Sequence, residues 1–190
     1  MIRRTFVALS LVALCAPLFA AELEIGAKAP AFKGLPGTDG KEYSLDAMKD
    51  AKAIVVCFTC NQCPVSVAYE DRFVEFQNKY GAKGVKFVAI NANKAREDLA
   101  AMKTRAEEKG FNFPYVFDAS GKLATEYGAR VTPHIFVLDA NRAVAYVGAF
   151  DDSQAKPSKH YVADAVDAIL AGKKVETTNT KAVGCGIANK

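Results

Sequence analysis

The sequence predicts an α/β fold with a mixed central sheet, flanked by helices and completed by a C-terminal β-hairpin and helix. Residues 52–58 are apolar without alternation, which is typical of a strand covered on both faces, and residues 85–91 indicate the next strand. A segment with helical periodicity follows the first strand, and a further helix is expected after the second. Near the C-terminus, two apolar strands joined by a short turn indicate a hairpin. This order of elements favours one mixed sheet.

The chain has 190 residues, which is long enough for one domain with its own core. Its hydrophobic content of 51% and charged content of 24% are typical of globular proteins. The sequence has no internal repeat. We therefore expect a single domain over residues 21–190, ending in a polar, glycine-containing tail at 173–190.

The first twenty residues differ in character from the rest. Arg3 and Arg4 precede an apolar run that Pro17 interrupts and that ends in small residues. This pattern predicts a secretory signal peptide over residues 1–20, with an uncleaved N-terminal anchor as the alternative. The run is too short for a convincing membrane span. We therefore expect a periplasmic or secreted protein without a membrane span after cleavage.

The charge balance argues against a nucleic-acid partner. Loss of Arg3 and Arg4 would lower the formal net charge from +4 to +2, and the chain has no tryptophan and no basic stripe. Export implies an oxidising compartment. A redox-active cysteine pair in that compartment needs a partner that recycles it.

The N-terminal part predicts short elements. Residues 30–32 look like an edge segment within a lead-in that contains two prolines. Residues 37–40 form a turn signal, and a short strand over 41–45 follows it. A helical turn over 46–50 then leads into the first core strand.

The middle of the chain alternates helices and strands. A helix is expected over 63–80, because its apolar residues recur near helical spacing and glycines follow it. After the strand at 85–91, Asn93 is expected to cap a helix running to about residue 109. An extended piece over 113–118 and a short helix over 120–127 complete this part.

The last third predicts the hairpin and the final helix. A strong apolar strand over 131–139 contains Pro133, and a turn leads into a second strand over 143–148. Ser158 is expected to cap the last helix, which has one apolar face and ends at Gly172.

The pair Cys60-Asn61-Gln62-Cys63 directly follows the first core strand and opens a helix. At such a place, unpaired helix N–H groups and the positive end of the helix dipole favour a thiolate. We expect Cys60, nearer the helix start, to attack disulfides. Cys63, one turn further in, is expected to resolve the mixed disulfide.

A structural zinc site is the alternative interpretation of two cysteines at this spacing. Zinc usually needs a second pair of Cys or His ligands at knuckle spacing. The other cysteines of the mature chain, Cys57 and Cys185, provide no such pair. We therefore expect redox chemistry with no metal and no cofactor.

The position of these motifs resembles the thioredoxin fold. The cysteine pair follows the first core strand, and Thr132-Pro133 opens the hairpin where thioredoxin-like proteins carry a cis-proline facing the disulfide. The long middle segment, residues 93–127, resembles the redoxin branch, which includes peroxiredoxins and exported TlpA-like reductases. Residues 60–64 with 68–72, and the ending Gly184–Ile187, resemble a bacterial AhpC/TSA-like group of thioredoxin-family proteins.

The resemblance implies that Cys60, Cys63, Thr132 and Pro133 form the site. A cis bond at Pro133 would place the Thr132 backbone against the disulfide, where it could pair with an extended substrate chain. Neighbouring His134 could shuttle a proton, bind a metal or point away from the thiols.

The remaining two cysteines leave several possibilities open. Cys57 lies within a strand, where a cysteine is usually a small buried hydrophobe. Cys185 could be a third redox thiol, a partner of Cys57 or a free thiol.

The leading hypothesis is an exported thiol–disulfide oxidoreductase that acts on protein or small-molecule thiols and disulfides. A peroxiredoxin-like thiol peroxidase is the first alternative. That family has Thr or Ser three residues before its reactive cysteine and an arginine beside it, whereas Thr59 is four residues before Cys63 and Pro133 aligns with the arginine. The second alternative is a copper-binding or metallochaperone module using Cys60, Cys63 and His134, because thiolates and imidazole suit copper.

Overall fold

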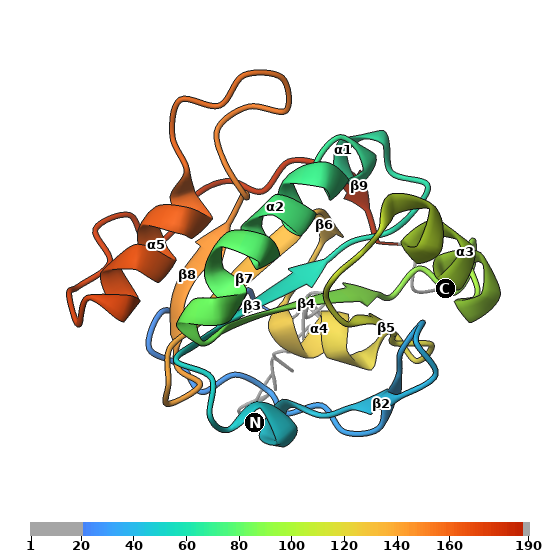
Figure 1. Cartoon of the computed structure of the whole chain (residues 1–190), viewed down its shortest axis with the longest axis horizontal. Helices are drawn as coiled ribbons and strands as arrows, with labels where there is room; N and C mark the ends of the chain where they lie inside the picture. Colours follow the sequence, from blue (N-terminus) through green and yellow to red (C-terminus); the bar gives the residue numbers. More distant parts are fainter. Residues whose placement is uncertain (1–20, 188–190) are drawn as a thin grey trace, which may run out of the picture.

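The computed structural model describes residues 21–187 and shows a mixed five-stranded sheet (Figure 1). The predicted signal peptide, residues 1–20, lies outside the described residues. The strand order is β5-β4-β3-β7-β8; β3, β4 and β5 are parallel, and β7 and β8 are antiparallel to their neighbours. The strands are β3 (Ala53–Phe58), β4 (Val85–Asn91), β5 (Tyr115–Phe117), β7 (His134–Leu138) and β8 (Val144–Gly148). The predicted fold class is confirmed.

Helices cover both faces of this sheet. The larger core lies beneath α2 (Glu70–Tyr80), α3 (Leu99–Lys109) and α5 (Tyr161–Leu170). On the other face, α4 (Lys122–Tyr127) and the 3-10 turn η1 (Leu45–Met48) pack on the second core. Figure 1 shows α2 and α5 in front of the sheet and α4 behind it.

The central strand β3 contributes to both cores. Side chains of a strand alternate between faces, so Ala53, Val55 and Cys57 enter the larger core while the residues following each of them enter the second. All six side chains are fully buried. This explains why the run is apolar without alternation, and it fixes the end of β3 where the cysteine pair begins.

The predicted helix over 63–80 is two helices, α1 (Pro64–Val67) and α2. The Tyr69 N–H bonds to the Ser66 carbonyl three residues back, which tightens the chain and ends α1. The buried Tyr69 ring stacks on Phe73, and its hydroxyl donates to Asp151 at 2.8 Å. These tertiary contacts hold the break between the two helices.

Two predicted helix caps are wrong. Asp98 caps α3, because its carboxylate accepts the Ala101 N–H at 2.8 Å, and Asn93 lies in the preceding loop. The last helix begins after His160. Ser158 bonds to the Asp152 carboxylate instead of capping it.

Two small ribbons complete the fold. β1 (Leu35–Pro36) pairs with β2 (Glu42–Tyr43), and the turn η2 (Gly81–Lys83) follows α2. The predicted strand over 131–139 is divided at Pro133 into β6 (Val131–Thr132) and β7. β6 pairs with β9 (Cys185–Gly186), so the C-terminal tail packs against the domain.

Within residues 21–187, no helix is both long and apolar enough to cross a membrane.

Candidate active site

The two cysteines of the motif lie in different local structures. Cys63 is the N-cap of α1, with Pro64 in the first turn, where proline is well suited. Cys60 lies in the loop between β3 and α1 and is not at the helix start. The expectation that Cys60 opens the helix and Cys63 lies one turn inside it is therefore wrong.

Thr132 links both sulfur atoms to the start of the hairpin. The Thr132–Pro133 peptide bond is cis, as predicted. The Thr132 hydroxyl lies 3.3 Å from the Cys60 Sγ, and the Cys63 thiol lies 2.9 Å from the Thr132 carbonyl oxygen, to which it donates. The structure thus brings together Cys60, Cys63 and the residue before Pro133, although 69 positions separate Cys63 from Thr132.

The pKa values of the two thiols shift in opposite directions. Burial raises the pKa of Cys63, but donors around its sulfur outweigh burial and lower the pKa to about 7. The donors are the Cys185 thiol, the Ser66 N–H, the Thr132 side chain and the Cys185 N–H. The thiol's bond to the Thr132 carbonyl opposes them, since it favours the protonated form. Cys63 is therefore the thiol that ionises more readily.

Cys60 lacks this set of donors. Burial raises its pKa, and the negative charge of Glu97 adds to the effect. Hydrogen bonds from Thr132 and the Cys63 N–H lower the pKa of Cys60, but not enough to offset burial and the charge of Glu97. The expectation that Cys60 ionises below an ordinary thiol is wrong, because a buried anion there would have too few donors.

A buried carboxylate that the sequence did not identify supports the cysteine loop. Glu97 is 6% exposed and accepts the N–H groups of Asn61 and Gln62 at 2.9 and 3.0 Å. The Asn91 side chain donates to the same carboxylate at 2.7 Å. Asn91 also donates to the Tyr115 hydroxyl, which in turn donates to the Asn61 side chain at 2.8 Å. This network holds the loop between the two cysteines in place.

Cys185 is the third thiol of the site. Its backbone N–H lies 3.4 Å from the Cys63 Sγ, and the two side chains share a hydrogen bond. That bond to Cys63, together with burial and the charges of the other two thiols, raises the pKa of Cys185 to about 11. The sequence analysis left the role of Cys185 open, and only the folded chain shows that it contacts Cys63.

Within residues 21–187, neither Cys57 nor His134 hydrogen-bonds to the sulfur atom of Cys60 or Cys63. Cys57 points into the larger core and is fully buried, and burial, reinforced by the charge of Cys60, raises its pKa well above the ordinary value. His134 is buried; its Nδ1 accepts the Arg130 N–H, and its Nε2 lies 2.9 Å from a Glu22 carboxylate oxygen without hydrogen-bond alignment. Burial lowers the pKa of His134, although Glu22 opposes this.

The ligand set of the copper hypothesis is not assembled. It requires Cys60, Cys63 and His134 together, but His134 contacts Glu22 and packs on Phe136 instead. Within residues 21–187, no group of three His, Cys, Asp or Glu side chains is arranged to hold a metal ion.

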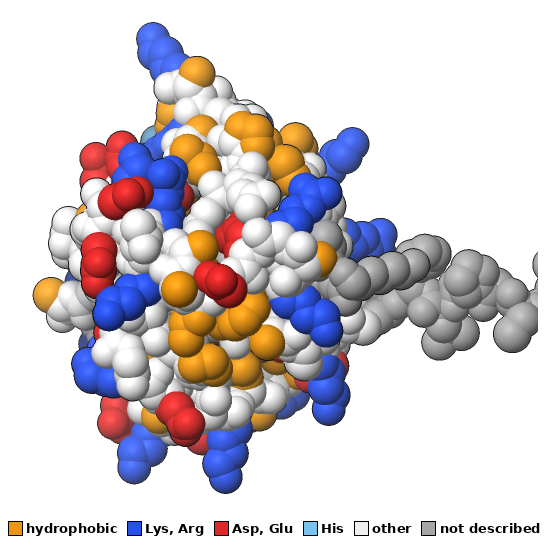
Figure 2. Space-filling model, turned by 90° about the vertical axis from the view of Figure 1, so that its right-hand side faces the viewer, with side chains coloured by type: hydrophobic (Ala, Val, Ile, Leu, Met, Phe, Trp, Pro, Cys, Tyr) orange, Lys and Arg blue, Asp and Glu red, His pale blue; other side chains and the backbone are white. Residues whose placement is uncertain are grey.

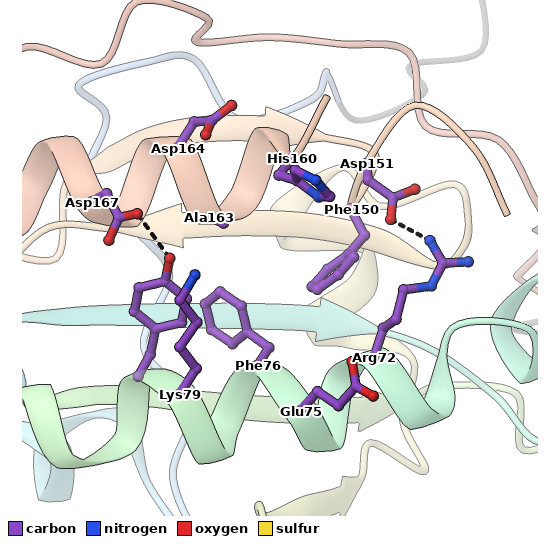
Figure 3. Close-up of a pocket in the computed structure, with 11 residues that line it drawn as sticks. Arg72, Glu75, Phe76, Lys79, Phe150, Asp151, His160, Ala163, Asp164 and Asp167 are labelled. Atoms are coloured by element: carbon purple, nitrogen blue, oxygen red, sulfur yellow. Dashed lines mark hydrogen bonds and ion pairs between the residues drawn. The ribbon is translucent and has the colours of Figure 1, made fainter. Parts of the chain in front are cut away.

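A groove of about 300 Å³ lies between α2 and α5, apart from the thiols (Figure 3). Phe76 and Phe150 point into it, and Asp167 bonds across it to the Tyr80 hydroxyl. Its lining contains no cysteine, so we attribute the groove to the packing of α5 on α2.

On the face shown in Figure 2, lysine and arginine side chains are separated by acidic and apolar ones.

Comparisons with known proteins agree with this geometry. The family model for Redoxin matches residues 24–166. No curated protein sequence matches the chain. A hypothetical protein of Sinorhizobium meliloti 1021 is 35% identical, with a TM-score of 0.84 over 90% of this chain and 97% of its own. An uncharacterized conserved protein of Geobacillus kaustophilus is 33% identical, with a TM-score of 0.83 over 96% of this chain and 98% of its own.

A relative with a more informative name is less similar. A thiol:disulfide interchange protein of the thioredoxin family from Chlorobium tepidum TLS is 26% identical. Its TM-score is 0.60 over 80% of this chain and 98% of its own. The sheet order, the cis-proline before β7 and the match over residues 24–166 lead to one conclusion. The chain belongs to the Redoxin family and has the thioredoxin-like fold.

Proposed function

We propose that this protein is an exported thiol–disulfide oxidoreductase in which Cys63 attacks and Cys60 is its partner in the Cys-x-x-Cys disulfide. The observation that carries the proposal is that the Cys60 and Cys63 sulfurs both contact Thr132, beside the cis Thr132–Pro133 bond. The hydrogen-bond donors around Cys63, which lower its pKa to about 7, favour Cys63 as the attacking thiol. The thiolate is the nucleophile of disulfide exchange. The name of the Chlorobium relative, a thiol:disulfide interchange protein, supports the same chemistry.

The reaction transfers two electrons in two exchanges. The Cys63 thiolate attacks one sulfur of a substrate disulfide, so that a Cys63–substrate bond forms and the other substrate sulfur leaves as a thiolate. Cys60 then attacks the Cys63 sulfur, the Cys60–Cys63 bond forms, and the second substrate thiolate leaves with the Cys60 proton. The reverse sequence oxidises a dithiol, and the reduction potentials of the two couples decide the direction.

The surroundings of the pair assign further roles. The Thr132 backbone beside Pro133 would pair with an extended substrate chain, as the family resemblance implies. Substrates are protein or small-molecule thiols and disulfides, and a redox partner restores the Cys60–Cys63 pair after each cycle. Export rests on the leader over residues 1–20. Cell fractionation and the N-terminal mass of the mature chain test it, and a chain retaining Met1 in the cytoplasm contradicts it.

A trapping experiment tests the roles of the two thiols. In a Cys185→Ser background, Cys60→Ser removes the resolving thiol but keeps the attacking one. Mixed disulfides between Cys63 and its substrates should therefore accumulate on non-reducing gels. Cys63→Ser in the same background should trap nothing. Adducts that form through Cys60 in the Cys63→Ser protein would show that the roles are reversed.

A thiol peroxidase is the second candidate, because Cys63 has a lowered pKa and opens a helix beginning with Pro64. Cys60 occupies the position three residues before Cys63 where peroxiredoxins have Thr or Ser. No arginine of residues 21–187 hydrogen-bonds the Cys63 sulfur. Hydrogen peroxide should therefore oxidise the reduced protein no faster than an ordinary thiolate. Stopped-flow oxidation that is orders of magnitude faster would favour the peroxidase.

A further inference from the structure

The C-terminal residues 184–187 lie along β6 at the thiol site, as Figure 1 shows for β6 and β9. Cys185 is the register partner of Thr132 in an antiparallel pair. The Ile187 N–H donates to the Arg130 carbonyl at 3.0 Å, which extends the pairing. The tail therefore occupies the backbone edge next to Pro133, where an extended substrate chain is expected to bind.

Gly184 allows this close approach. A Cβ atom at this position would lie 1.9 Å from the Thr132 carbonyl oxygen and 2.6 Å from its carbon. Any side chain larger than hydrogen would therefore displace the tail from Thr132. Gly186, two residues on, has nothing within 4 Å of the corresponding position. Only one of the two glycines flanking Cys185 is required for the contact.

The docked tail brings Cys185 to Cys63. The Cys185 N–H lies 3.4 Å from the Cys63 Sγ, and the two thiol groups are hydrogen-bonded. Cys57 makes no comparable contact, because it faces the larger core beside Val55. Among the described cysteines, Cys63 thus has two neighbouring thiols, Cys60 in the loop and Cys185 on the tail.

We propose that Cys185 is a second resolving thiol, which forms a Cys63–Cys185 disulfide while the tail lies in the substrate position as an internal substrate. This inference rests on the proposed function, because it requires Cys63 to react with disulfides. In this inference, Cys185 on the tail and Cys60 in the loop both attack the same sulfur, that of Cys63.

The chemistry balances with an external disulfide as oxidant. The Cys63 thiolate attacks the disulfide, a Cys63–substrate bond forms and one substrate thiolate leaves. The Cys185 sulfur attacks Cys63, the Cys63–Cys185 bond forms, and the second substrate thiolate leaves with the Cys185 proton. The external disulfide is reduced by two electrons, and the Cys63–Cys185 pair is oxidised by two.

The docked tail also lies against Cys63, which is only 1% exposed. Separation of β9 from β6 would open this side of the Cys63 sulfur to an external disulfide. β9 is only two residues long, and such short pairings open more readily than the strands of the core. Because the tail remains attached, its thiol returns at a high effective concentration and competes with Cys60 for the mixed disulfide.

Peptide mapping of the full mature chain tests the proposal. Reduced Cys60→Ser protein is treated with hydroxyethyl disulfide, free thiols are alkylated, and non-reduced peptides are identified by mass spectrometry. The expected product is a Cys63–Cys185 peptide. Cys185→Ser should instead give Cys60–Cys63, and the Cys60→Ser/Cys185→Ser protein should keep the hydroxyethyl adduct on Cys63.

Two outcomes would overturn the proposal, and they differ in what they say about the proposed function. If Cys60→Ser keeps the adduct while Cys185→Ser closes Cys60–Cys63, this inference fails and the oxidoreductase function stands. If Cys63 forms no adduct and no disulfide in any variant, both fail.

The two glycines provide a matched pair that leaves every thiol in place. In the Cys60→Ser background, Gly184→Ala should slow the closure of Cys63–Cys185 by roughly 100-fold, because the added Cβ displaces the tail and its thiol from Cys63. The Gly186→Ala variant should form the Cys63–Cys185 disulfide at the same rate as the Cys60→Ser parent, because a Cβ at this position meets no other atom. Formation of the hydroxyethyl adduct in both variants shows that Cys63 is intact. Equal closure rates would mean that pairing of β9 with β6 does not position Cys185, and the proposal would be wrong.

Discussion

Cys57 and Cys63 lie at opposite ends of one short segment, and each is separated from Cys60 by two residues. Cys57 is within β3, fully buried against the larger core, and its pKa is raised well above the ordinary value. Cys63 is almost as buried, at 1% exposed, yet its pKa is lowered to about 7. Neither the spacing nor the solvent exposure of the two residues distinguishes them.

The difference lies in the hydrogen-bond donors around each sulfur. An ionised Cys57 would face apolar side chains, so burial dominates its pKa. Cys63 lies just beyond the strand end, where donors from α1, β6 and β9 meet and outweigh the effect of burial on its pKa. The lowered pKa of Cys63 is therefore a consequence of its position at the junction of these three elements.

The largest effect that tests this comparison comes from replacing each cysteine separately. Cys63→Ser should abolish reduction of small disulfides, because the attacking thiolate is lost. Cys57→Ala should leave the reaction unchanged and lower the free energy of unfolding by about 1 kcal/mol, since it leaves a small void in the core. Turnover of hydroxyethyl disulfide with a chemical reductant, and urea unfolding, measure the two effects. If the Cys57→Ala protein folds but no longer reduces hydroxyethyl disulfide, Cys57 takes part in the reaction and the proposed difference between Cys57 and Cys63 is wrong.

A titration of the thiols sharpens the same contrast. With a pKa of about 7, half of Cys63 is thiolate at pH 7, roughly 15-fold more than an unperturbed thiol with a pKa near 8.5. The thiolate fraction falls as pH drops through 7, so Cys63 alkylation should decline below that pH and level off above pH 8. Cys60 should react only at higher pH, because its pKa is raised. Alkylation by iodoacetamide, followed peptide by peptide, measures both. A midpoint for Cys60 below that for Cys63 would reverse their assignment.

The sequence predicted the fold well because its strongest signals are local. The apolar run at 85–91 matches β4 residue for residue, and the run at 52–58 overestimates β3 by one residue. The cis bond at Pro133 is also as predicted, from the family resemblance. Periodicity failed at the 63–80 helix, because the break at Tyr69 depends on Asp151, which is 82 positions away.

The proximity of the candidate site residues was predicted, but the position of each cysteine relative to the helix was not. Cys60, Cys63 and Thr132 do meet, but Cys63 occupies the helix start that was expected for Cys60. One missing signal was the donor set on Cys63, part of which comes from Cys185, 122 positions away. The other missing signal was the role of Glu97. In the sequence Glu97 resembles an ordinary surface acid, and only the folded structure shows that its carboxylate accepts the backbone N–H groups of the cysteine loop.

The smallest effect concerns Glu97, whose charge raises the pKa of Cys60 and thereby adds to the contrast with Cys63. Glu97→Gln removes that charge, so the pKa of Cys60 should fall. A larger thiolate fraction at pH 7 should then speed the closure of Cys60–Cys63 by less than about tenfold, since nucleophilicity falls with pKa. The amide also leaves one of three donors without an acceptor, which should cost roughly 1–3 kcal/mol of stability.

Asp98→Asn is the matched control for Glu97→Gln. It removes one negative charge from the next residue, which is exposed and caps α3, and asparagine caps a helix about as well as aspartate. Closure of a preformed hydroxyethyl adduct on Cys63, measured in a Cys185→Ser background, should therefore be unchanged by Asp98→Asn and faster with Glu97→Gln. Equal acceleration by both would indicate a general change in surface charge. Slower closure with Glu97→Gln alone would contradict the prediction. It would mean that the hydrogen bonds by which the Glu97 carboxylate holds the loop affect the closure rate more than its charge does.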